Sequence, residues 1–314
     1  MTDRPIPILL NPSAGSGKAG RARERLEAEL KRQGIFYTLT ITDSEAQLRS
    51  LTRSLAAEGL TLAGAGGDST FLVMLNEIMA AQTRPRLGLI GIGSSNDIPR
   101  EFGIQTLERA CAALKGGTTR TIDIGFVEIG TEPKRHFLGQ ANIGLGAAVN
   151  RYVARLAERS RRLARRQSLA GFLGILDAYR SGRVPLDLKI EGPSGSARGK
   201  YVVAVFSNIR FWATGRIIAP GARPDDGALD ACLISACSIG RLARVNAAAK
   251  TGHHIRRREV TMLRSPEFRV SSPRAFLIQA DGEIVAVEGR PVSCRRALIG
   301  VRPSALDILV PPTA

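Results

Sequence analysis

Long apolar runs are missing from this sequence of 314 residues. No stretch of it approaches the roughly 18 uninterrupted apolar residues that a membrane-crossing helix needs. The apolar run near the N-terminus, Ile6–Leu10, is followed at once by polar and glycine residues and is too short for a signal peptide. We therefore expect a cytoplasmic protein whose contact with any membrane is peripheral.

Cysteine is scarce, and the four cysteines that are present form no CxxC pair. They are Cys111, Cys232, Cys237 and Cys294. No histidine stands near them at a spacing typical of a metal site. Reduced and buried thiols are expected, which agrees with a cytoplasmic location.

Acidic and aromatic residues are also few. Asp and Glu number 28 against 45 Lys and Arg, so the formal net charge is +17, and this excess favours an anionic partner such as a phosphate or an acidic bilayer. Aromatic residues make up 5% of the sequence, and it contains neither a zinc finger nor an RNP-type aromatic motif. We therefore expect no specific binding of nucleic acid.

The hydrophobic pattern changes about a third of the way along the chain. From Pro5 to about Gly117, short apolar runs alternate with segments of helical period, as in a parallel sheet flanked by helices. After Thr119, alternating segments separated by turn residues predict antiparallel β-structure. The strands expected in the first part are Ile6–Leu10, Phe36–Ile41, Leu60–Ala65 and Leu87–Ile92, and the helices are Gly20–Gln33, Glu45–Glu58, Thr70–Ala81 and Thr106–Lys115. Further helices are expected within Ala147–Gly182 and Ile239–Gly252.

Three glycine-rich segments follow expected strands: Asn11–Gly20 (NPSAGSGKAG), Gly64–Thr70 (GAGGDST) and Gly91–Arg100 (GIGSSNDIPR). Loops after parallel strands meet at one edge of a sheet, where ligands bind, and their N–H groups hold phosphate. The first is no Walker loop, because Pro12 and Ala19 occupy positions that need Gly and Ser or Thr. It contains GxGxxG, but four residues separate this motif from the strand, so a dinucleotide site is a weak alternative.

These segments resemble the NPxSG, GGDGT and GTGND signatures of the diacylglycerol kinase catalytic family, which also includes sphingosine and ceramide kinases. The resemblance extends over most of the chain. Asn142–Val149 is similar to the family's post-hairpin segment, Ala219–Asp230 to its metal-site loop, and Ala280–Glu283 (ADGE) to its catalytic turn. The resemblance implies an ATP-dependent, magnesium-requiring kinase that phosphorylates a hydroxyl of a membrane lipid such as diacylglycerol or a sphingoid lipid.

The implied fold has two domains of the NAD kinase/diacylglycerol kinase type. A three-layer α/β nucleotide-binding domain is expected at residues 1–120, and an antiparallel β-sandwich domain for the lipid at residues 121–294. Residues 295–314 are expected to pack back on the first domain, and ATP is expected in the cleft.

The resemblance also implies roles for individual residues. Asp281 or Glu283 is implied as the general base, since a hydroxyl that attacks phosphorus loses its proton. Asp226 and the carbonyls of Arg223 and Ala228 are implied to bind Mg²⁺, linked through water to Asp68 and Asp123, since hard cations prefer oxygen ligands. Residues implied to contact the nucleotide are Asn11, Pro12, Ser13, Ala14, Gly15, Thr40 (or Thr42), Gly66, Gly67, Asp68, Ser69, Thr70, Gly93, Ser94, Asn96 and Asp97.

Departures from the family pattern keep alternatives open. Ser69 stands where the second loop usually has glycine, so its side chain would crowd the phosphate or disfavour a positive φ. Leu72-Val73 replaces a common Asn-Glu pair. One alternative is therefore a noncatalytic or weakly active protein that binds nucleotide or lipid, and another is an NAD kinase-like enzyme.

The segment from Arg151 to Gln167 is rich in arginine and predicts a basic amphipathic helix. Such a helix suits peripheral docking on an anionic membrane, although a simple solvated face remains the alternative. The sequence does not determine the oligomeric state, and an oligomer is one possibility.

Overall fold

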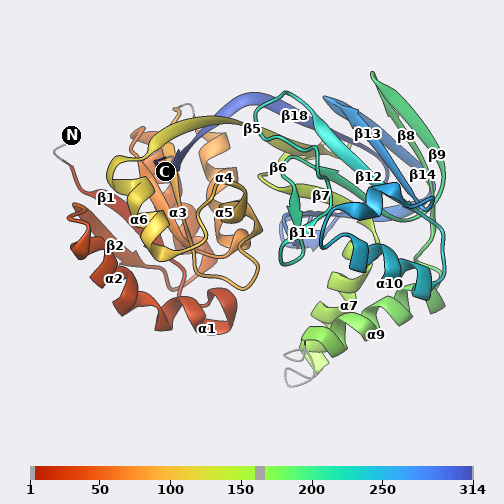
Figure 1. Ribbon diagram of the computed structural model, residues 1–314, viewed down its shortest axis with the longest axis horizontal. Coiled ribbons are helices and arrows are strands. Elements are labelled where there is room, and N and C mark those ends of the chain that lie inside the picture. Colours follow the sequence, from red (N-terminus) through yellow and green to blue (C-terminus); the bar gives the residue numbers. More distant parts are fainter. Residues whose placement is uncertain (1–3, 82, 160–166, 313–314) are drawn as a thin grey trace.

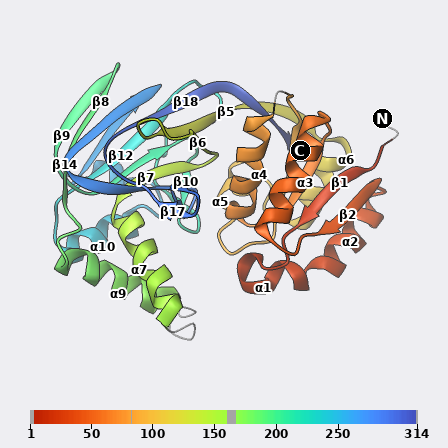
Figure 2. The same cartoon turned by 180° about the vertical axis from the view of Figure 1, so that it is seen from behind.

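The computed structural model describes residues 4–81, 83–159 and 167–312. The chain forms two lobes joined by long strands (Figures 1 and 2). None of the described helices is both long and apolar enough to cross a membrane.

The first lobe is a parallel sheet in the order β4-β3-β1-β2. Its strands are β1 (Ile6–Leu10), β2 (Tyr37–Ile41), β3 (Leu62–Gly66) and β4 (Arg86–Gly91). Its helices are α1 (Ala14–Arg21), α2 (Arg23–Arg32), α3 (Glu45–Ala57), α4 (Asp68–Ala80), α5 (Asp97–Glu101) and α6 (Leu107–Gly116). Helices α3 and α4 pack together, as do α2 and α6, so the sheet lies in the middle of three layers (Figure 1).

Local sequence explains where these helices begin. Ser44 precedes α3 and its side chain accepts a hydrogen bond from the N–H of Gln47, while Thr106 caps α6 in the same way through the N–H of Arg109. The central strand β3 is buried throughout, as expected of a parallel strand covered on both faces.

The second lobe is antiparallel. Its long strands are β5 (Thr118–Glu128), β8 (Leu186–Gly192), β9 (Gly195–Ser207), β12 (Leu229–Ser235), β13 (Val260–Ser265), β14 (Glu267–Ala280) and β18 (Ser293–Val310). The short ones are β6 (Arg135–Phe137), β7 (Gln140–Gly144), β10 (Phe211–Trp212), β11 (Arg216–Ile217), β15 (Glu283–Ile284), β16 (Ala286–Val287) and β17 (Arg290–Pro291). Its helices are α7 (Leu145–Arg159), α9 (Gln167–Arg180), α10 (Ile239–Ala248) and the 3₁₀ turn η1 (His253–Arg256).

Strands β9 and β14 are joined at one end by β7 and at the other by β8, so the sheet encloses an apolar core. Phe206 and Phe268 meet inside it with ring centroids 5.3 Å apart. A separate apolar cluster lies between this sheet and the helices α7, α9 and α10. The expected combination of an α/β lobe and a β-sandwich-like lobe is confirmed.

Strand β18 connects the lobes. It pairs antiparallel with β14 and β5, and near its end Asp307 and Ile308 pair in parallel with Arg86 and Leu87 of β4. One continuous sheet therefore runs through both lobes. The division into residues 1–120, 121–294 and 295–314 stays a prediction.

Most expected elements of the first lobe lie close to their predicted ranges, but two expectations were wrong. The segment Asn11–Gly20 is not a loop throughout, because helix α1 already begins at Ala14. The third segment contains the short helix α5, which the sequence reading did not anticipate. Residues 160–166, part of the expected basic helix, lie outside the described chain.

Candidate active site

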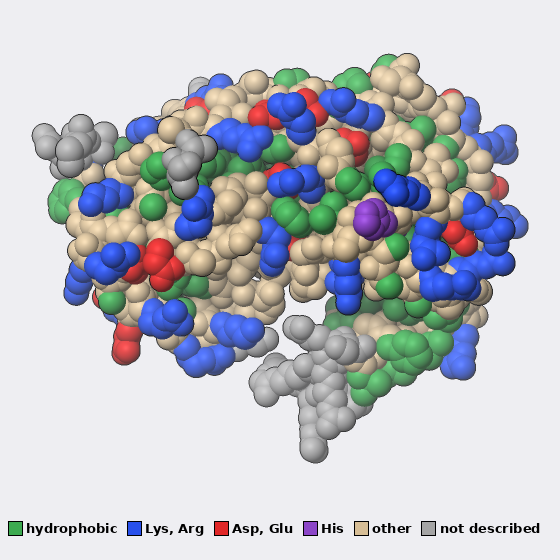
Figure 3. All heavy atoms as spheres, in the orientation of Figure 1, with side chains coloured by type: hydrophobic (Ala, Val, Ile, Leu, Met, Phe, Trp, Pro, Cys, Tyr) green, Lys and Arg blue, Asp and Glu red, His purple; other side chains and the backbone are tan. Residues whose placement is uncertain are grey.

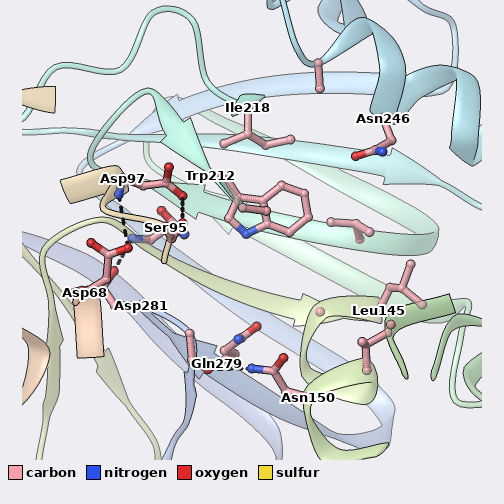
Figure 4. Close-up of a pocket in the computed structure, with 18 of the residues that line it drawn as sticks. Asp68, Ser95, Asp97, Leu145, Asn150, Trp212, Ile218, Asn246, Gln279 and Asp281 are labelled. Carbon is pink, nitrogen blue, oxygen red and sulfur yellow. Dashed lines mark hydrogen bonds between the residues drawn. The ribbon is translucent and has the colours of Figure 1, made fainter. Parts of the chain in front are cut away.

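A cavity of 720 Å³ lies between the two lobes, and we call it the central cavity. The molecular surface is hollowed between the lobes (Figure 3). The polar end of this cavity carries Asp68, Asp97 and Asp281, and the Trp212 ring stands between these aspartates and Leu145 (Figure 4). The far end is apolar and is lined by Leu145, Val149, Phe172, Ile175, Ile218, Ile234, Leu242 and Val245. The cavity therefore joins a polar site to an apolar channel.

The glycine-rich segments after β1, β3 and β4 meet at the polar end. The second and third segments touch through their backbones, since a Cβ at Gly93 would lie 2.5 Å from the Cα of Gly67. The first and second are joined by a 3.1 Å hydrogen bond that Asn11 Nδ2 donates to Thr70 Oγ1. A Cβ at Gly66 would lie 2.3 Å from that Oγ1, so the site requires glycine there.

Helices α1 and α4 begin at this edge of the sheet. Neither cap residue, Ser13 nor Gly67, provides a side-chain hydrogen bond to its helix. Gly15, which lines the cavity, has a φ of 61°, a backbone conformation that suits glycine. The positive ends of two helix dipoles make this edge suited to phosphate.

The third segment is shaped by its own side chains. Asn96 has a φ of 53°, and its Oδ1 accepts a 2.9 Å hydrogen bond from the N–H of Gly93. The Asp97 carboxylate accepts hydrogen bonds from the N–H groups of Thr214 (3.0 Å) and Gly215 (2.7 Å) in the β10–β11 hairpin. Asp97 therefore ties the first lobe to the second beside the cavity.

Asp68 is the first residue of α4 and faces the other two aspartates. Its carboxylate accepts hydrogen bonds from the N–H groups of Asp97 (3.2 Å) and Ile98 (3.3 Å). Burial, followed by the nearby charge of Asp97 and then that of Asp281, raises the pKa of Asp68 to about 7. The polar end therefore concentrates negative charge that a bound cation would offset.

The Asp281 carboxylate is held by three backbone N–H groups. It accepts hydrogen bonds from the N–H groups of Leu138 (2.6 Å), Gly139 (2.8 Å) and Gln140 (2.9 Å). Its φ of 44° is unusual for a residue with a side chain and holds the carboxylate at the cavity wall. Burial raises the pKa of Asp281 to about 6, although the three N–H donors oppose this rise. Such a carboxylate suits a general base that works near neutral pH.

A second cavity of 840 Å³, which we call the side cavity, adjoins the central one. It is lined by Asn11, Ser13, Thr42 and Thr70 of the first lobe and by Arg135 of the second. Both cavities include Ser69 and Glu283 in their walls. Burial, and then the charge of Glu45, raises the pKa of Glu283, while Arg135 opposes the rise. A ligand in the side cavity can therefore reach the polar end of the central cavity.

The site implied for magnesium, the Asp226 carboxylate with the carbonyls of Arg223 and Ala228, stays a prediction. Asp123 accepts hydrogen bonds from the N–H groups of Gly227 (2.6 Å) and Ser304 (2.7 Å), so it organises the loop that contains Asp226. The Asp226 carboxylate is itself engaged by Arg264 (2.6 Å) and by the N–H of Ala228 (3.2 Å). Across the part of the chain that the structure describes, no group of three or more His, Cys, Asp or Glu residues is placed to hold a metal ion through side chains alone. The Arg223 side chain pairs with Asp225 at 3.4 Å.

The remaining predicted residues divide into two groups. Ser94 and Ala14 line the central cavity, whereas Thr40 is exposed on β2 and lines none of the described cavities. Thr42, the alternative to Thr40, is buried and lines the side cavity. Ser69 lies in the first turn of α4 without a positive φ, so the anticipated backbone conflict is absent. Pro12 packs under Gly20 of α1.

Sequence reasoning missed Arg135 and Trp212. Arg135 lies on β6 and lines the side cavity together with Glu283, in a hairpin with no recognisable motif. Trp212 is the single tryptophan of the chain and belongs to a two-residue strand.

Comparisons with known proteins agree with this geometry. Residues 5–127 match the family model of the diacylglycerol kinase catalytic domain, and residues 139–310 match the model described as YegS C-terminal NAD kinase beta sandwich-like domain. A diacylglycerol kinase of Mycobacterium tuberculosis is 28% identical over 313 residues, which cover 98% of this chain and 95% of that protein. A probable YegS-like lipid kinase of Pseudomonas aeruginosa is 26% identical over 312 residues, with the same shares covered.

Solved structures show the same fold. The crystal structure of a putative diacylglycerol kinase from Bacillus anthracis superposes with a TM-score of 0.73 at 17% identity. The superposition covers 99% of this chain and 99% of that one.

Proposed function

We propose, from the chain's membership of the diacylglycerol kinase family of lipid kinases, that it transfers the γ-phosphoryl group of ATP to a hydroxyl of an acyl-chain-bearing membrane lipid of the diacylglycerol class. The observation that carries this proposal is the central cavity, whose polar end holds the aspartates and whose far end is apolar. Such a cavity suits a substrate with a small polar head and hydrocarbon chains. The apolar lining disfavours NAD, the acceptor of the NAD kinase alternative.

The nucleotide is proposed to occupy the side cavity, with its phosphates at the helix ends of α1 and α4. Asn11, Ser13 and Thr70 line that cavity beside the phosphate end, and Thr42 lies further along its wall. Arg135 adds a positive charge near the place where the terminal phosphate would lie. Because Ser69 lines both cavities, the γ-phosphate is expected beside it.

Asp281 is proposed as the general base. The lipid oxygen forms a bond to the γ-phosphorus as the bond from that phosphorus to the β–γ bridging oxygen breaks. The hydroxyl proton passes to the Asp281 carboxylate, and ADP leaves with the pair of electrons from the broken bond. Glu283 lies at the junction of the two cavities, and among the described residues no hydrogen bond holds its carboxylate as three N–H groups hold that of Asp281, so it is the weaker candidate for this role.

Magnesium is proposed to accompany ATP, where it would neutralise phosphate charge. The ligands implied for it are the Asp226 carboxylate and the carbonyls of Arg223 and Ala228, linked through water to Asp68 and Asp123, and no step above depends on them. Asp68 is the carboxylate of this group that reaches the polar end of the cavity.

The enzyme is proposed to reach its substrate by peripheral docking through α9. Leu169 and Phe172 lie on this helix with 40% and 51% of their surface exposed, and Phe172 also lines the central cavity. Exposed apolar side chains at the mouth of an apolar channel suit insertion into a bilayer. A lipid then enters the channel without crossing water.

The direct test measures transfer of label from γ-labelled ATP to lipids in neutral mixed micelles. Diacylglycerol, monoacylglycerol, ceramide and sphingosine are offered separately, and the products are separated by thin-layer chromatography. The proposal predicts a labelled phospholipid from diacylglycerol. ATP binding without any labelled lipid would instead support the noncatalytic alternative.

A further inference from the structure

A third pocket, of 390 Å³, lies on the opposite side of α7 from the central cavity, and we call it the rear pocket. Leu145 and Val149 of α7 face the central cavity, whereas Ala147, Ala148 and Arg151 of the same helix line the rear pocket. Its other walls are the turn after α9, strand β14 and the beginning of β18. The view from behind shows α7 below β14 (Figure 2).

Three arginines from three different elements line this pocket, and among the residues that the structure describes no acidic side chain does. They are Arg151 of α7, Arg183 of the turn after α9, and Arg274 of β14. Arg274 is held in place because it donates hydrogen bonds to the carbonyls of Gly182 (2.7 Å) and Pro185 (2.5 Å). Arg183 pairs with Asp177, which lies outside the pocket wall.

Two of the three positive charges in the rear pocket have no ion-pair partner among the described residues, the exception being Arg183. Among residues 4–81, 83–159 and 167–312, Arg151 has no carboxylate within ion-pair distance, and Arg274 has none either. Partial burial, followed by the charges of Arg155 and Arg183, lowers the pKa of Arg151. An anion in the pocket would offset this positive charge.

We propose that the rear pocket binds a phosphate group, the source being the headgroup of an anionic phospholipid. Guanidinium groups bind phosphate oxygens through paired N–H donors, and Arg274 is already oriented by its two carbonyl partners. The pocket volume lies within the range of small-molecule sites, so a headgroup fits. Phe276 and Leu186 in its wall offer apolar contact to the glycerol portion.

A ligand in the rear pocket would also act on the central cavity. Helix α7 forms one wall of each, so a headgroup held by Arg151 restrains the helix that carries Leu145 and Val149. The site would thereby couple an anionic membrane surface to the shape of the lipid channel.

The test is isothermal titration calorimetry of the full chain with dihexanoyl phosphatidylglycerol below its micelle concentration, and separately with inorganic phosphate. Arg151→Gln is expected to weaken binding of the short-chain lipid by about tenfold, the loss of a charge-assisted contact. Arg198→Gln removes the same charge from an exposed position on β9 and is expected to leave the affinity unchanged. Ala243→Trp, which narrows the central cavity, is also expected to leave it unchanged.

Three results overturn the proposal: no binding by the parent protein, equal losses in Arg151→Gln and Arg198→Gln, or a loss in Ala243→Trp with none in Arg151→Gln. The two ligands distinguish the sources of the phosphate. Tighter binding of the phospholipid supports a membrane headgroup. If the phospholipid and inorganic phosphate bind with equal affinity, and both affinities fall in Arg151→Gln, the lipid source is overturned. The ligand is then a soluble phosphate. Because the readout is binding, it does not depend on kinase activity.

Discussion

A Cβ placed on Gly93 would lie 2.5 Å from the Cα of Gly67, so the second and third phosphate-site segments touch through their backbones. Gly93→Ala is therefore expected to force these segments apart, at a cost of about 1–3 kcal/mol in the free energy of unfolding. The affinity for ATP should also fall in this variant, because α4, whose N-terminus is proposed to hold the phosphates, begins directly after Gly67. Urea unfolding and ATP titration measure the two effects.

The matched control is Gly116→Ala at the end of α6, where nothing lies within 4 Å of the added Cβ. This variant should bind ATP like the parent. Equal behaviour of Gly93→Ala and Gly116→Ala would show that the contact between the two segments is unimportant.

The pH dependence of activity should follow Asp281. Its pKa is raised from 3.8 to about 6 by burial, and only the ionised carboxylate accepts a proton. The value of kcat/KM is therefore expected to rise as the pH increases through about 6 and to level off above it. The Glu283→Gln variant should show the same rise of kcat/KM with pH. If the rise is absent in that variant, Glu283 is the general base.

The apolar channel can be narrowed from the surface of α10. Ala243 is exposed and lines the central cavity, so Ala243→Trp should raise the KM for long-chain diacylglycerol by about tenfold, the scale of a few lost methylene contacts. The KM for ATP should not change. Ala247 lies one helical turn further, is exposed and lines no described cavity, so Ala247→Trp is the control. Identical kinetics of Ala243→Trp and Ala247→Trp would show that the lipid does not bind in the central cavity.

Docking through α9 predicts that Leu169→Ser combined with Phe172→Ser reduces sedimentation of the protein with lipid vesicles several-fold, because less apolar surface is buried in the bilayer. Phe36→Ser changes a side chain that is 64% exposed on the first lobe, before β2, and should have no effect. If Phe36→Ser has the larger effect, the membrane faces the first lobe instead.

The sequence was sufficient to predict the parallel sheet and the meeting of its three glycine-rich segments, because strand spacing and glycine positions are local signals. It failed where local signals were ambiguous. The glycines of the first segment suggested a loop through Gly20, yet Gly15 and Gly17 adopt positive φ inside a short helical stretch that begins at Ala14.

The apolar end of the central cavity and the wall of the side cavity depend on contacts between segments that are distant in the sequence. Trp212, Arg135 and the pairing of α7 with α9 have no fixed spacing from the motifs, so periodicity alone did not place them. At Ser69 the sequence suggested a problem that the structure does not have. This serine replaces the family's usual glycine, and the first turn of α4 accommodates it. The predicted roles of the site residues stay predictions until variants are assayed.

The most direct test of the account is phosphoryl transfer from ATP to diacylglycerol by the parent protein and by Asp281→Asn, with ATP binding measured on both. The account predicts that the variant binds ATP like the parent while kcat falls by about 10²–10⁴-fold, the contribution of a general base. An Asp281→Asn protein that retains the parental kcat would contradict the proposed mechanism.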